Sequence, residues 1–482
     1  MKNVLTKFSQ LVAASLAISS ACIAAAQTQS NIHLDAATRN TGGDPFVTEY
    51  SRAFYCNLPE NNNGIVVAAR GWNNQTGTGP TAQYRIPLTQ IFDDVWAIGN
   101  HYVVQYIIKT PDGLVQVDSG NTASEFQLFD YQALLTLGLS PTYPLKQIYL
   151  THGHGDHDGG AQWALTNLGT RSSLGSADIN LGGPKTYNPI LIDSTDHSMR
   201  TMSVGGKQFW IMPTPGHTPG ATSAVLEVKD WGQTKRVLMN GGQSMTNSIS
   251  DVEDYLDSVE RTYAMVQTLN VDGVMTPHIY WDGEGTKLDE IKAKGRTNPS
   301  QNIVGHEAVA RQMAIARECT AAWLTQLDTT VSTPVWRYNT VDFAPASPIP
   351  GRFAAKVTNG WGPLPNKQVT FKHDAGGEAC SATTDATGTA TCSGSFGPFP
   401  QGDTVSVSFA GTSASDFIDL PGQKSATVGT GCSDLAAAKA ALGTKVGGAG
   451  YVARLDVDGN GVIDIRDVAG VSKLMAAGTV CH

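Results

Sequence analysis

Imidazole and carboxylate groups are concentrated in one short loop of this chain. The segment Ile148–Gly160 reads IYLTHGHGDHDGG, so three histidines and an aspartate fall within six residues, directly after an apolar, β-branched run. Residues two apart in an extended segment face the same way, so His152 and His154 can bind one ion, and the glycines between them let the backbone bend tightly. Asp156 and His157 then turn toward a second position as the chain enters a helix. Imidazole nitrogens combined with a carboxylate oxygen suit zinc.

The segments on either side of this loop predict a layered α/β domain. VWAIG, YVVQYIIKT and LVQVDSG read as strands, and the last two are joined by a turn at Pro111-Asp112-Gly113. The following segment, ASEFQLFDYQALLTLGL, places apolar side chains on one helical stripe. KQIYLT is again a strand, and GGAQWALTNLG is again a helix. We expect this α/β domain to cover residues 86–327.

The string THGHGDH resembles the signature of the metallo-β-lactamase superfamily. Three other segments fit the same pattern in order, namely VDSG with Asp118, PGHTPG with His217 and MTPHIYWDG with His278. The resemblance implies a four-layer αββα sandwich with a two-zinc site at one edge of the sheets. It assigns the first zinc to His152, His154 and His217. It assigns the second zinc to Asp156, His157 and His278, with Asp118 behind the ligands.

Two departures from the superfamily pattern narrow the resemblance. Glyoxalase-like, lactonase-like and nuclease-like members place a bridging aspartate on the strand where this chain has Asn240-Gly241-Gly242. The thiolate ligand of another β-lactamase subclass is also absent. The ligand set therefore resembles that of the third subclass of zinc β-lactamases, and the chain resembles an uncharacterised offshoot of that subclass. The serine that is usual near Gly242 in that subclass is missing. Ser244 is a candidate replacement as a substrate contact, and His101, beside a predicted strand, is a second candidate.

The implied reaction is hydrolysis by a metal-bound hydroxide. Two zinc ions about 3.5–4 Å apart can share a hydroxide whose parent water has its pKa lowered to near 7. The hydroxide attacks a carbonyl, and zinc stabilises the oxyanion that develops. Asp156 is the expected catalytic residue, because it both binds the second zinc and orients the nucleophile, and it can pass a proton to the leaving group.

The best-supported substrate on this resemblance is the cyclic amide of a β-lactam. A lactone or an ester is the alternative for the same centre. A surface binding protein with a vestigial hydrolase domain is a hypothesis of another class, which the complete set of six ligands disfavours, because drift would be expected to damage ligands first. Iron-based hydroxylation or redox chemistry is disfavoured, since iron-bearing relatives usually keep the missing bridging acid.

Length, charge and the first residues indicate an exported protein of several domains. The chain has 482 residues, a formal net charge of −9 and no Lys/Arg block, which excludes a nucleic-acid groove. Residues 1–26 combine two lysines, a short apolar run and a small-x-small site, so they read as a signal peptide cleaved after Ala26. The run is shorter than the roughly 20 residues of a membrane span. We expect a secreted, periplasmic or cell-surface protein; ISSAC around Cys22 leaves a lipoprotein signal as the alternative.

Six cysteines remain after the signal peptide. An even number in an exported chain implies disulfides. Six cysteines allow fifteen pairings, but their positions favour neighbours. The expected pairs are Cys380–Cys392, Cys432–Cys481 and, by remainder, Cys56–Cys319.

Three further regions flank or follow the α/β domain. Residues 27–85 are rich in Asn, Gly, Thr and Gln and predict an irregular lead-in, and residues 328–350 predict a Pro/Thr/Ser-rich linker. Residues 351–430 show short period-2 runs split by turns, which predict a small all-β sandwich. VTNGWGPLPNKQVTF and CSATTDATGTATC in this region resemble bacterial immunoglobulin-like repeats, for which a spacer or attachment role is the default.

Residues 431–482 contain LDVDGNGVIDIRD, which matches the EF-hand pattern D-x-[DN]-x-[DN]-G-x₅-[DE]. We expect one calcium ion, with Asp464 acting through water and Asp467 closing the loop. The remaining expected ligands are the side chains of Asp456, Asp458 and Asn460 and the carbonyl of Val462. With the helix VAGVSKLMAAG the segment resembles a dockerin repeat. A dockerin that binds a cohesin normally has two repeats and this chain has one, so we expect a small helical, calcium-stabilised module rather than a cohesin-binding one.

Overall fold

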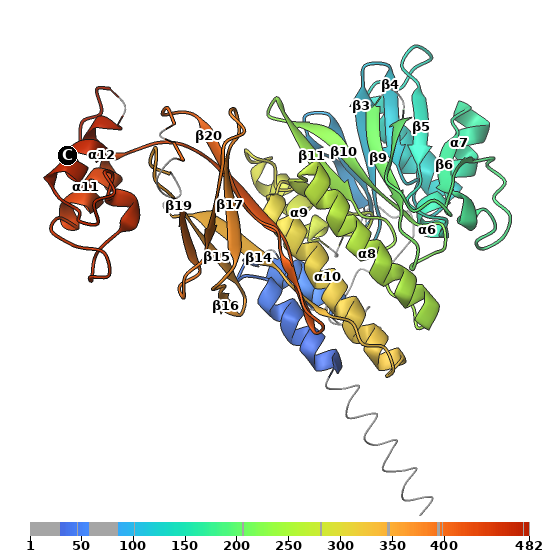
Figure 1. Ribbon diagram of the computed structural model, residues 1–482. Coiled ribbons are helices and arrows are strands. Elements are labelled where there is room, and N and C mark those ends of the chain that lie inside the picture. Colours follow the sequence, from blue (N-terminus) through green and yellow to red (C-terminus); the bar gives the residue numbers. More distant parts are fainter. Residues whose placement is uncertain are drawn as a thin grey trace, which may run out of the picture. The chain divides into compact units, whose positions relative to one another are not determined.

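The computed structural model in Figure 1 describes residues 29–45, 47–56, 85–100, 102–204, 207–279, 282–344, 348–392, 396–397, 399–475 and 477–481. The expected signal peptide, residues 1–26, and His101 lie outside them. The chain divides into two compact units, Met1–Thr333 and Pro334–His482. Among the helices of the described residues, none combines the length and apolar character that a membrane span needs.

The first unit contains a seven-stranded sheet in which the strands lie in sequence order. The strands are β1 (Arg85–Phe92), β2 (Val95–Asn100), β3 (Val104–Thr110), β4 (Gly113–Val117), β5 (Leu145–Tyr149), β6 (Ser172–Gly175) and β7 (Ile190–Ile192). Strands β1 to β4 pair antiparallel, and β4 to β7 pair parallel. Parallel neighbours need a crossover connection, and helices lie between β4 and β5 and between β5 and β6.

A second sheet of five strands has the order β12-β11-β10-β9-β8. Its strands are β8 (Arg200–Val204), β9 (Lys207–Pro213), β10 (Thr222–Asp230), β11 (Gln233–Met239) and β12 (Gly273–Met275). Strands β8 to β11 are antiparallel, and β12 lies parallel to β11 after the long helix α8 (Ile249–Leu269).

Alternating side chains on the strands build two cores, one on each face of the first sheet. In β3, Tyr106 and Ile108 join a core shared with Phe209 and Leu226 of the second sheet, while Ile107 points to the opposite core. That opposite core holds apolar residues of α5 (Tyr131–Thr136) and α7 (Ala161–Leu168). The same cluster of buried residues extends to side chains of α8, of α9 (Glu284–Lys294) and of α10 (His306–Leu327).

The order of layers is therefore helix, sheet, sheet, helix. Figure 1 shows α7 beside the first sheet and α8 and α10 along the second. The expected α/β class of the first unit is confirmed. The predicted helix over residues 123–139 is present as α4 (Ala123–Glu125), a π-helical turn η4 (Phe126–Asp130) and α5.

The expectation of an irregular lead-in over residues 27–85 is wrong for its first part. Residues 29–40 are helical, followed by η1 (Val47–Arg52) and α2 (Ala53–Tyr55). The buried face of the first helix carries small or polar side chains at helical spacing, namely Ser30, His33, Ala36, Ala37 and Asn40. Because the stripe lacks large apolar residues, hydrophobic periodicity did not reveal it. Residues 57–84 of the expected lead-in lie outside the described residues.

The second unit begins with two four-stranded sheets that enclose one core. One sheet contains β14 (Asn339–Phe343), β15 (Phe353–Asn359), β16 (Gly362–Pro363) and β19 (Thr389–Cys392). The other contains β18 (Ala379–Thr383), β17 (Gln368–His373), β20 (Thr404–Phe409) and β23 (Gly422–Thr427). A third, smaller sheet contains β13 (Val335–Arg337), β22 (Phe417–Asp419) and β21 (Thr412–Ser413).

The expectation of a linker over residues 328–350 is wrong for β13 and β14. Val341 and Phe343 of β14 are buried in the core between the two four-stranded sheets, so the segment belongs to the sandwich. The Pro, Thr and Ser residues around it led to the linker prediction, although VDF within it alternates buried and exposed positions.

The last part of the second unit is helical. It contains α11 (Cys432–Ala440), η6 (Ala453–Leu455) and α12 (Ile465–Lys473) around a small apolar core that includes Leu455 and Ile463. The described residues contain three disulfides with the pairings expected from the sequence, Cys56–Cys319, Cys380–Cys392 and Cys432–Cys481.

Candidate metal centre

The histidine loop occupies the connection between the end of β5 and the short helix α6 (Gly155–Asp158). His154 is the N-cap residue of α6 and keeps an extended backbone, with φ −71° and ψ 149°. His152 lies in the bend before the helix, whereas Asp156 and His157 lie in the first turn of the helix. This change of backbone direction sends the four side chains to two different positions.

Three histidines form the first group. Nδ1 of His154 lies 3.1 Å from Nε2 of His152 and 3.1 Å from Nε2 of His217. His217 comes from the loop between β9 and β10 in the second sheet. One nitrogen from each of the three rings thus converges on a single point, as the resemblance implied.

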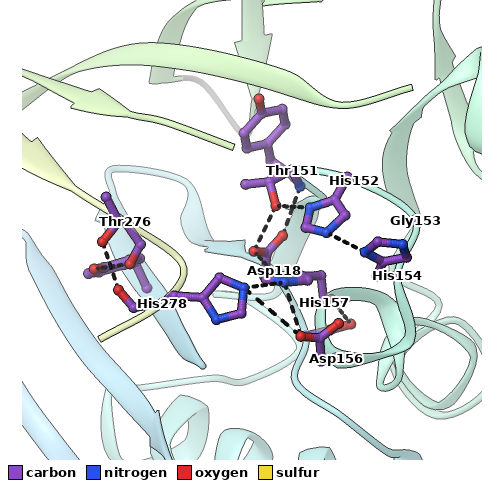
Figure 2. A network of polar contacts seen from close by, with 12 residues as sticks. Asp118, Thr151, His152, Gly153, His154, Asp156, His157, Thr276 and His278 are labelled. Carbon is purple, nitrogen blue, oxygen red and sulfur yellow. Dashed lines mark hydrogen bonds and ion pairs between the residues drawn. The ribbon is translucent and has the colours of Figure 1, made fainter. Parts of the chain in front are cut away.

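An aspartate and two histidines form the second group. Nε2 of His157 lies 3.2 Å from Nε2 of His278, and Oδ2 of Asp156 lies 3.4 Å from the first of these atoms and 4.0 Å from the second. His278 follows β12 in the second sheet. Figure 2 shows Asp156, His157 and His278 directed at one another, with Asp118 behind them.

Oxygen acceptors hold the opposite ring nitrogens of three of these histidines. Nδ1 of His157 lies 2.8 Å from Oδ2 of Asp118, Nδ1 of His278 lies 3.0 Å from the carbonyl oxygen of Tyr102, and Nδ1 of His217 lies 2.9 Å from the carbonyl oxygen of Ser244. An acceptor at Nδ1 places the proton there and leaves a lone pair on Nε2.

The donor set therefore fits a cation. Nε2 of His157 and Nε2 of His278 face each other at 3.2 Å, next to a carboxylate oxygen. A metal ion that displaces the proton on these nitrogens turns the same contacts into bonds. Two imidazoles with one carboxylate, and three imidazoles, are both ligand sets that zinc takes.

Asp118 orients ligands of both groups. It adopts a left-handed backbone conformation with φ 56°, and its side chain is fully buried. Its carboxylate accepts the backbone N–H of Thr151 at 2.8 Å and the Thr151 hydroxyl at 3.0 Å, and that hydroxyl lies 3.1 Å from Nδ1 of His152. Asp118 thus reaches His157 directly and His152 through Thr151 (Figure 2).

Burial sets the protonation of the metal-free ligands. It lowers the pKa of His278 to about 3, with His157 adding to the effect, and lowers the pKa of His217 to about 4. Burial also lowers the pKa of His157, but the Asp118 carboxylate outweighs it and raises this pKa to about 10. Burial would raise the pKa of Asp156, but the hydrogen bond and charge of His157 bring it below its usual range. Near pH 7 His278 and His217 are neutral and Asp156 is ionised, as cation binding requires, whereas His157 carries a second proton that a metal ion must displace.

The absence of a bridging acid at residues 240–242 has a steric reason. A Cβ on Gly241 would lie 2.2 Å from the carbonyl oxygen of Thr222. Gly242 has φ +68°, and a Cβ there would lie 3.0 Å from Cβ of His217. Asn240 points into the scaffold, where it accepts the Ser223 hydroxyl at 3.0 Å.

Ser244, expected as a substrate contact, lies against a metal ligand. Its hydroxyl and its carbonyl oxygen are both 2.9 Å from Nδ1 of His217, so it orients that ring. A role in binding substrate stays a prediction. His101, the second expected substrate contact, lies outside the described residues.

Sequence reasoning missed the residues that hold His278. The carbonyl oxygen of Tyr102 accepts from its ring, and the hydroxyl of Thr276 lies 2.8 Å from both the carbonyl oxygen of His278 and Oδ1 of Asp282. Lys287 donates to Oδ2 of Asp282 at 2.9 Å, and both side chains are buried. Only the Tyr102 contact joins segments far apart in the chain. Thr276, Asp282 and Lys287 are close to His278 in the sequence, but no spacing rule assigned them a role beside it.

A third group of possible ligands lies in the second unit. Carboxylate oxygens of Asp456, Asp458 and Asp467 lie within 4.8 Å of one another. Asp467 is fully buried and accepts the backbone N–H groups of Asp458 and Asp464 at 3.2 and 2.8 Å. Asp464 caps α12 and pairs with Arg466 at 2.7 Å, so its carboxylate is already engaged. Asn460 uses its side-chain oxygen to accept the N–H of Val462 at 2.8 Å.

Comparison with known proteins identifies the first unit. Residues 98–231 match the family model described as the metallo-beta-lactamase superfamily, a stretch that holds every proposed zinc ligand except His278.

Several solved structures resemble about half of the chain. A mutant of the metallo-beta-lactamase FEZ-1 from Legionella gormanii is 18% identical, with 48% of this chain and 93% of that chain covered and a TM-score of 0.41. BJP-1, a subclass B3 metallo-beta-lactamase of Bradyrhizobium japonicum, is 22% identical, with 48% and 91% covered and a TM-score of 0.38. A metallo-beta-lactamase of Cronobacter sakazakii is 21% identical, with 48% and 92% covered and a TM-score of 0.38.

Because these TM-scores are low, the assignment rests on the family match and on the two groups of ligands. The chain therefore contains a hydrolase domain of the zinc-dependent metallo-beta-lactamase superfamily.

Proposed function

We propose that the first unit is a dizinc hydrolase that opens a cyclic amide, with a β-lactam as its substrate. The observation that carries the proposal is the pair of ligand groups, each with its metal-binding atoms already turned together, and with Nδ1 of His157, His217 and His278 held by oxygen acceptors. When bound, zinc polarises a carbonyl and lowers the pKa of a coordinated water to about 7.

The protein's own residues have distinct roles in this reaction. Asp156 is the proposed catalytic residue, because its side chain is 26% exposed while those of His157 and His278 are 1% and 8% exposed. It is the member of the second group that can reach a substrate, orient the attacking oxygen and pass a proton to the leaving nitrogen. Asp118 keeps the rings of His152 and His157 in the orientation that presents Nε2 to the metal.

The choice of a β-lactam rests on the ligand set. Three histidines beside an Asp-His-His group, without a bridging acid, resemble the third subclass of zinc β-lactamases, and the structure leaves no room for a side chain at Gly241. A lactone or ester is the alternative substrate for the same centre. A surface binding protein with a vestigial hydrolase domain is the alternative from another class, and zinc content decides it.

We also propose that the protein is exported and that its second unit attaches or stabilises it. The signal-like residues 1–26 and the three disulfides support an oxidising compartment. The β-sandwich of the second unit is proposed as an immunoglobulin-like spacer.

For the terminal module we propose a single dockerin-like calcium site. Asp456, Asp458 and Asp467 already face one another and support it. Asn460, the carbonyl of Val462 and, through water, Asp464 complete the proposed set. A cohesin-like partner is not part of the proposal, since the chain has one such repeat.

A substrate panel tests the proposed reaction. The full-length secreted protein is offered nitrocefin, a carbapenem and N-acyl homoserine lactones, with and without a zinc chelator. We expect turnover of the β-lactams that the chelator abolishes. His217→Ala should lose it, whereas His306→Ala, a half-buried histidine bonded to the carbonyl oxygen of Val271, should keep it.

Three results would redirect the proposal. Turnover of the lactones alone would move it to the alternative substrate. Turnover that persists in the chelator would remove zinc from the mechanism. Less than one zinc per chain after gentle purification would support the binding role.

A further inference from the structure

Asp178 contacts both loops that carry the first group of ligands. It ends the short helix η5 (Ser176–Asp178), directly after β6, and its side chain is fully buried. Its Oδ2 accepts the backbone N–H of Gly153 at 2.8 Å and the hydroxyl of Thr218 at 2.7 Å, and its Oδ1 accepts the backbone N–H of Gly220 at 2.7 Å. Gly153 stands between His152 and His154, and Thr218 follows His217 directly.

Glycines make room for this carboxylate. A Cβ on Gly153 would lie 2.9 Å from Cβ of Asp178, and a Cβ on Gly220 would lie 2.6 Å from its Cγ. A Cβ on Gly175 would lie 2.0 Å from the carbonyl oxygen of Gly220. Both loops therefore approach Asp178 more closely than any residue with a side chain could, and the three hydrogen bonds satisfy the buried charge.

We propose that Asp178 is a positioning residue that holds these two loops in the register that brings His154 and His217 together. The proposal rests on the first unit being a zinc hydrolase. Nδ1 of His154 and Nε2 of His217 meet at 3.1 Å, although the two residues are 63 positions apart in the chain. Asp178 bonds to each loop within one residue of these ligands, so it fixes their separation before a metal arrives.

The effect should be confined to the first group. The second group takes its orientation from other residues, because Asp118 holds His157 and Tyr102 holds His278. Loss of such an orienting contact costs about 10- to 100-fold in metal affinity. Asp178→Asn keeps the size of the side chain but replaces one carboxylate oxygen with an NH₂ group. That group cannot accept the hydrogen bonds that Gly153, Thr218 and Gly220 donate to Asp178.

The test isolates each group with a ligand variant. Zinc affinity is measured by chelator competition in full-length protein carrying His278→Ala, where only the first group is complete, or His217→Ala, where only the second is. We expect Asp178→Asn to lower the zinc affinity about 10- to 100-fold in the His278→Ala protein. The zinc affinity of the His217→Ala protein should stay unchanged. The matched control is Asp230→Asn, because Asp230 is 3% exposed and accepts the N–H of Ser300 at 3.0 Å, at the far end of β10.

A second readout does not involve zinc. In metal-free protein, Asp178→Asn should speed hydrogen exchange of the Gly153 and Gly220 amides, which are bonded to Asp178, and Asp230→Asn should not. If Asp178→Asn does not fold, Thr218→Val replaces it, because this variant removes one hydrogen bond to Asp178 and no charge. It should lower the zinc affinity of the first group, by less than Asp178→Asn would. Equal zinc affinity and equal exchange in the Asp178 and Asp230 variants would overturn the proposal. A wild-type protein that binds no zinc would overturn the proposed function, and the exchange result would still decide the role of Asp178.

Discussion

The two candidate metal-binding regions of this molecule are organised in opposite ways. In the first unit the ligands extend from His152 to His278 and are held by partners from other segments of the chain, such as Asp118 and the carbonyl oxygen of Tyr102. In the second unit the ligands lie within Asp456–Asp467 and are held largely by N–H groups of the same loop.

This difference predicts what each ion does. Contacts that involve no ion bring the ligands of the first unit together, so we expect zinc to add chemistry without setting the shape of the site. The aspartate loop brings together the carboxylates of two buried residues, Asp456 and Asp467, and of the exposed Asp458, and we expect an ion to offset their mutual repulsion. Loss of zinc should remove activity with little change in fold, and loss of calcium should destabilise the terminal module.

The largest expected effect is the loss of hydrolysis on zinc removal. Dialysis against a chelator should lower kcat/KM by at least about 1,000-fold, because metal stabilisation of the transition state contributes several kcal/mol. The far-ultraviolet circular dichroism of the protein should stay nearly unchanged. Unfolding of the first unit on zinc removal would contradict the proposed difference between the two sites, because it would show that the zinc site also depends on its ion for its shape.

Asp118→Asn should produce the next largest effect. The amide cannot accept from both Thr151 and His157 as the carboxylate does, so the rings of both groups lose orientation. We expect zinc affinity to fall about 10- to 100-fold, measured by competition with a chromophoric chelator. Asp289→Asn on α9 serves as the control. Unchanged affinity in the Asp118 variant would show that the ligands orient themselves.

Calcium should stabilise the second unit alone. At a calcium concentration 100 times the dissociation constant, binding adds about 2.7 kcal/mol to the free energy of unfolding. Calorimetry should show one transition that shifts with calcium and another that does not. Asp467→Asn, at the buried end of the loop, should remove the shift. A calcium-dependent shift of the zinc-binding unit, or none at all, would contradict this assignment.

Acid should destabilise the zinc-free first unit. The pKa values of His278 and His217 are lowered by burial to about 3 and about 4, below the value near 6.5 expected in the unfolded chain. As the pH falls below 6.5, the unfolded chain binds more protons, so the free energy of unfolding decreases by up to about 1.4 kcal/mol per pH unit for each histidine. The pKa of His157 is raised to about 10, so its contribution to the free energy of unfolding is complete below pH 6.5 and is lost only as the pH rises above that value.

Urea unfolding of zinc-free protein between pH 7 and pH 5 measures this effect. The loop Asp456–Asp467 contains no histidine, so its titration should not contribute in that window. A flat stability profile for the first unit would show that the two rings are solvated in the metal-free state.

The sequence predicted those parts of the centre that are local in the chain. Three of the four loop ligands lie within a few residues of a strand end, and the spacing of glycines and histidines was enough to separate them into two groups. His217 and His278 required the resemblance to a family, because nothing in their own neighbourhoods ties them to the loop.

The supporting residues could not be predicted for the same reason. Asp178 acts through contacts with segments that are distant in the sequence, and it lies in no periodic pattern or motif. Asp282 contacts its sequence neighbours Thr276 and Lys287, but the segment MTPHIYWDG was read only for its histidine. The helix at residues 29–40 was not predicted, because its buried side chains are small or polar. They include His33, which pairs with the buried Glu318 at 2.7 Å. Periodicity reveals elements that bury apolar side chains, and these regions bury polar ones.

Anomalous diffraction at the zinc edge, on crystals grown with zinc, would locate the ions directly. We expect two peaks in the first unit, one among His152, His154 and His217 and the other among Asp156, His157 and His278. A single peak, no peak, or zinc bound away from these six side chains would contradict this expectation.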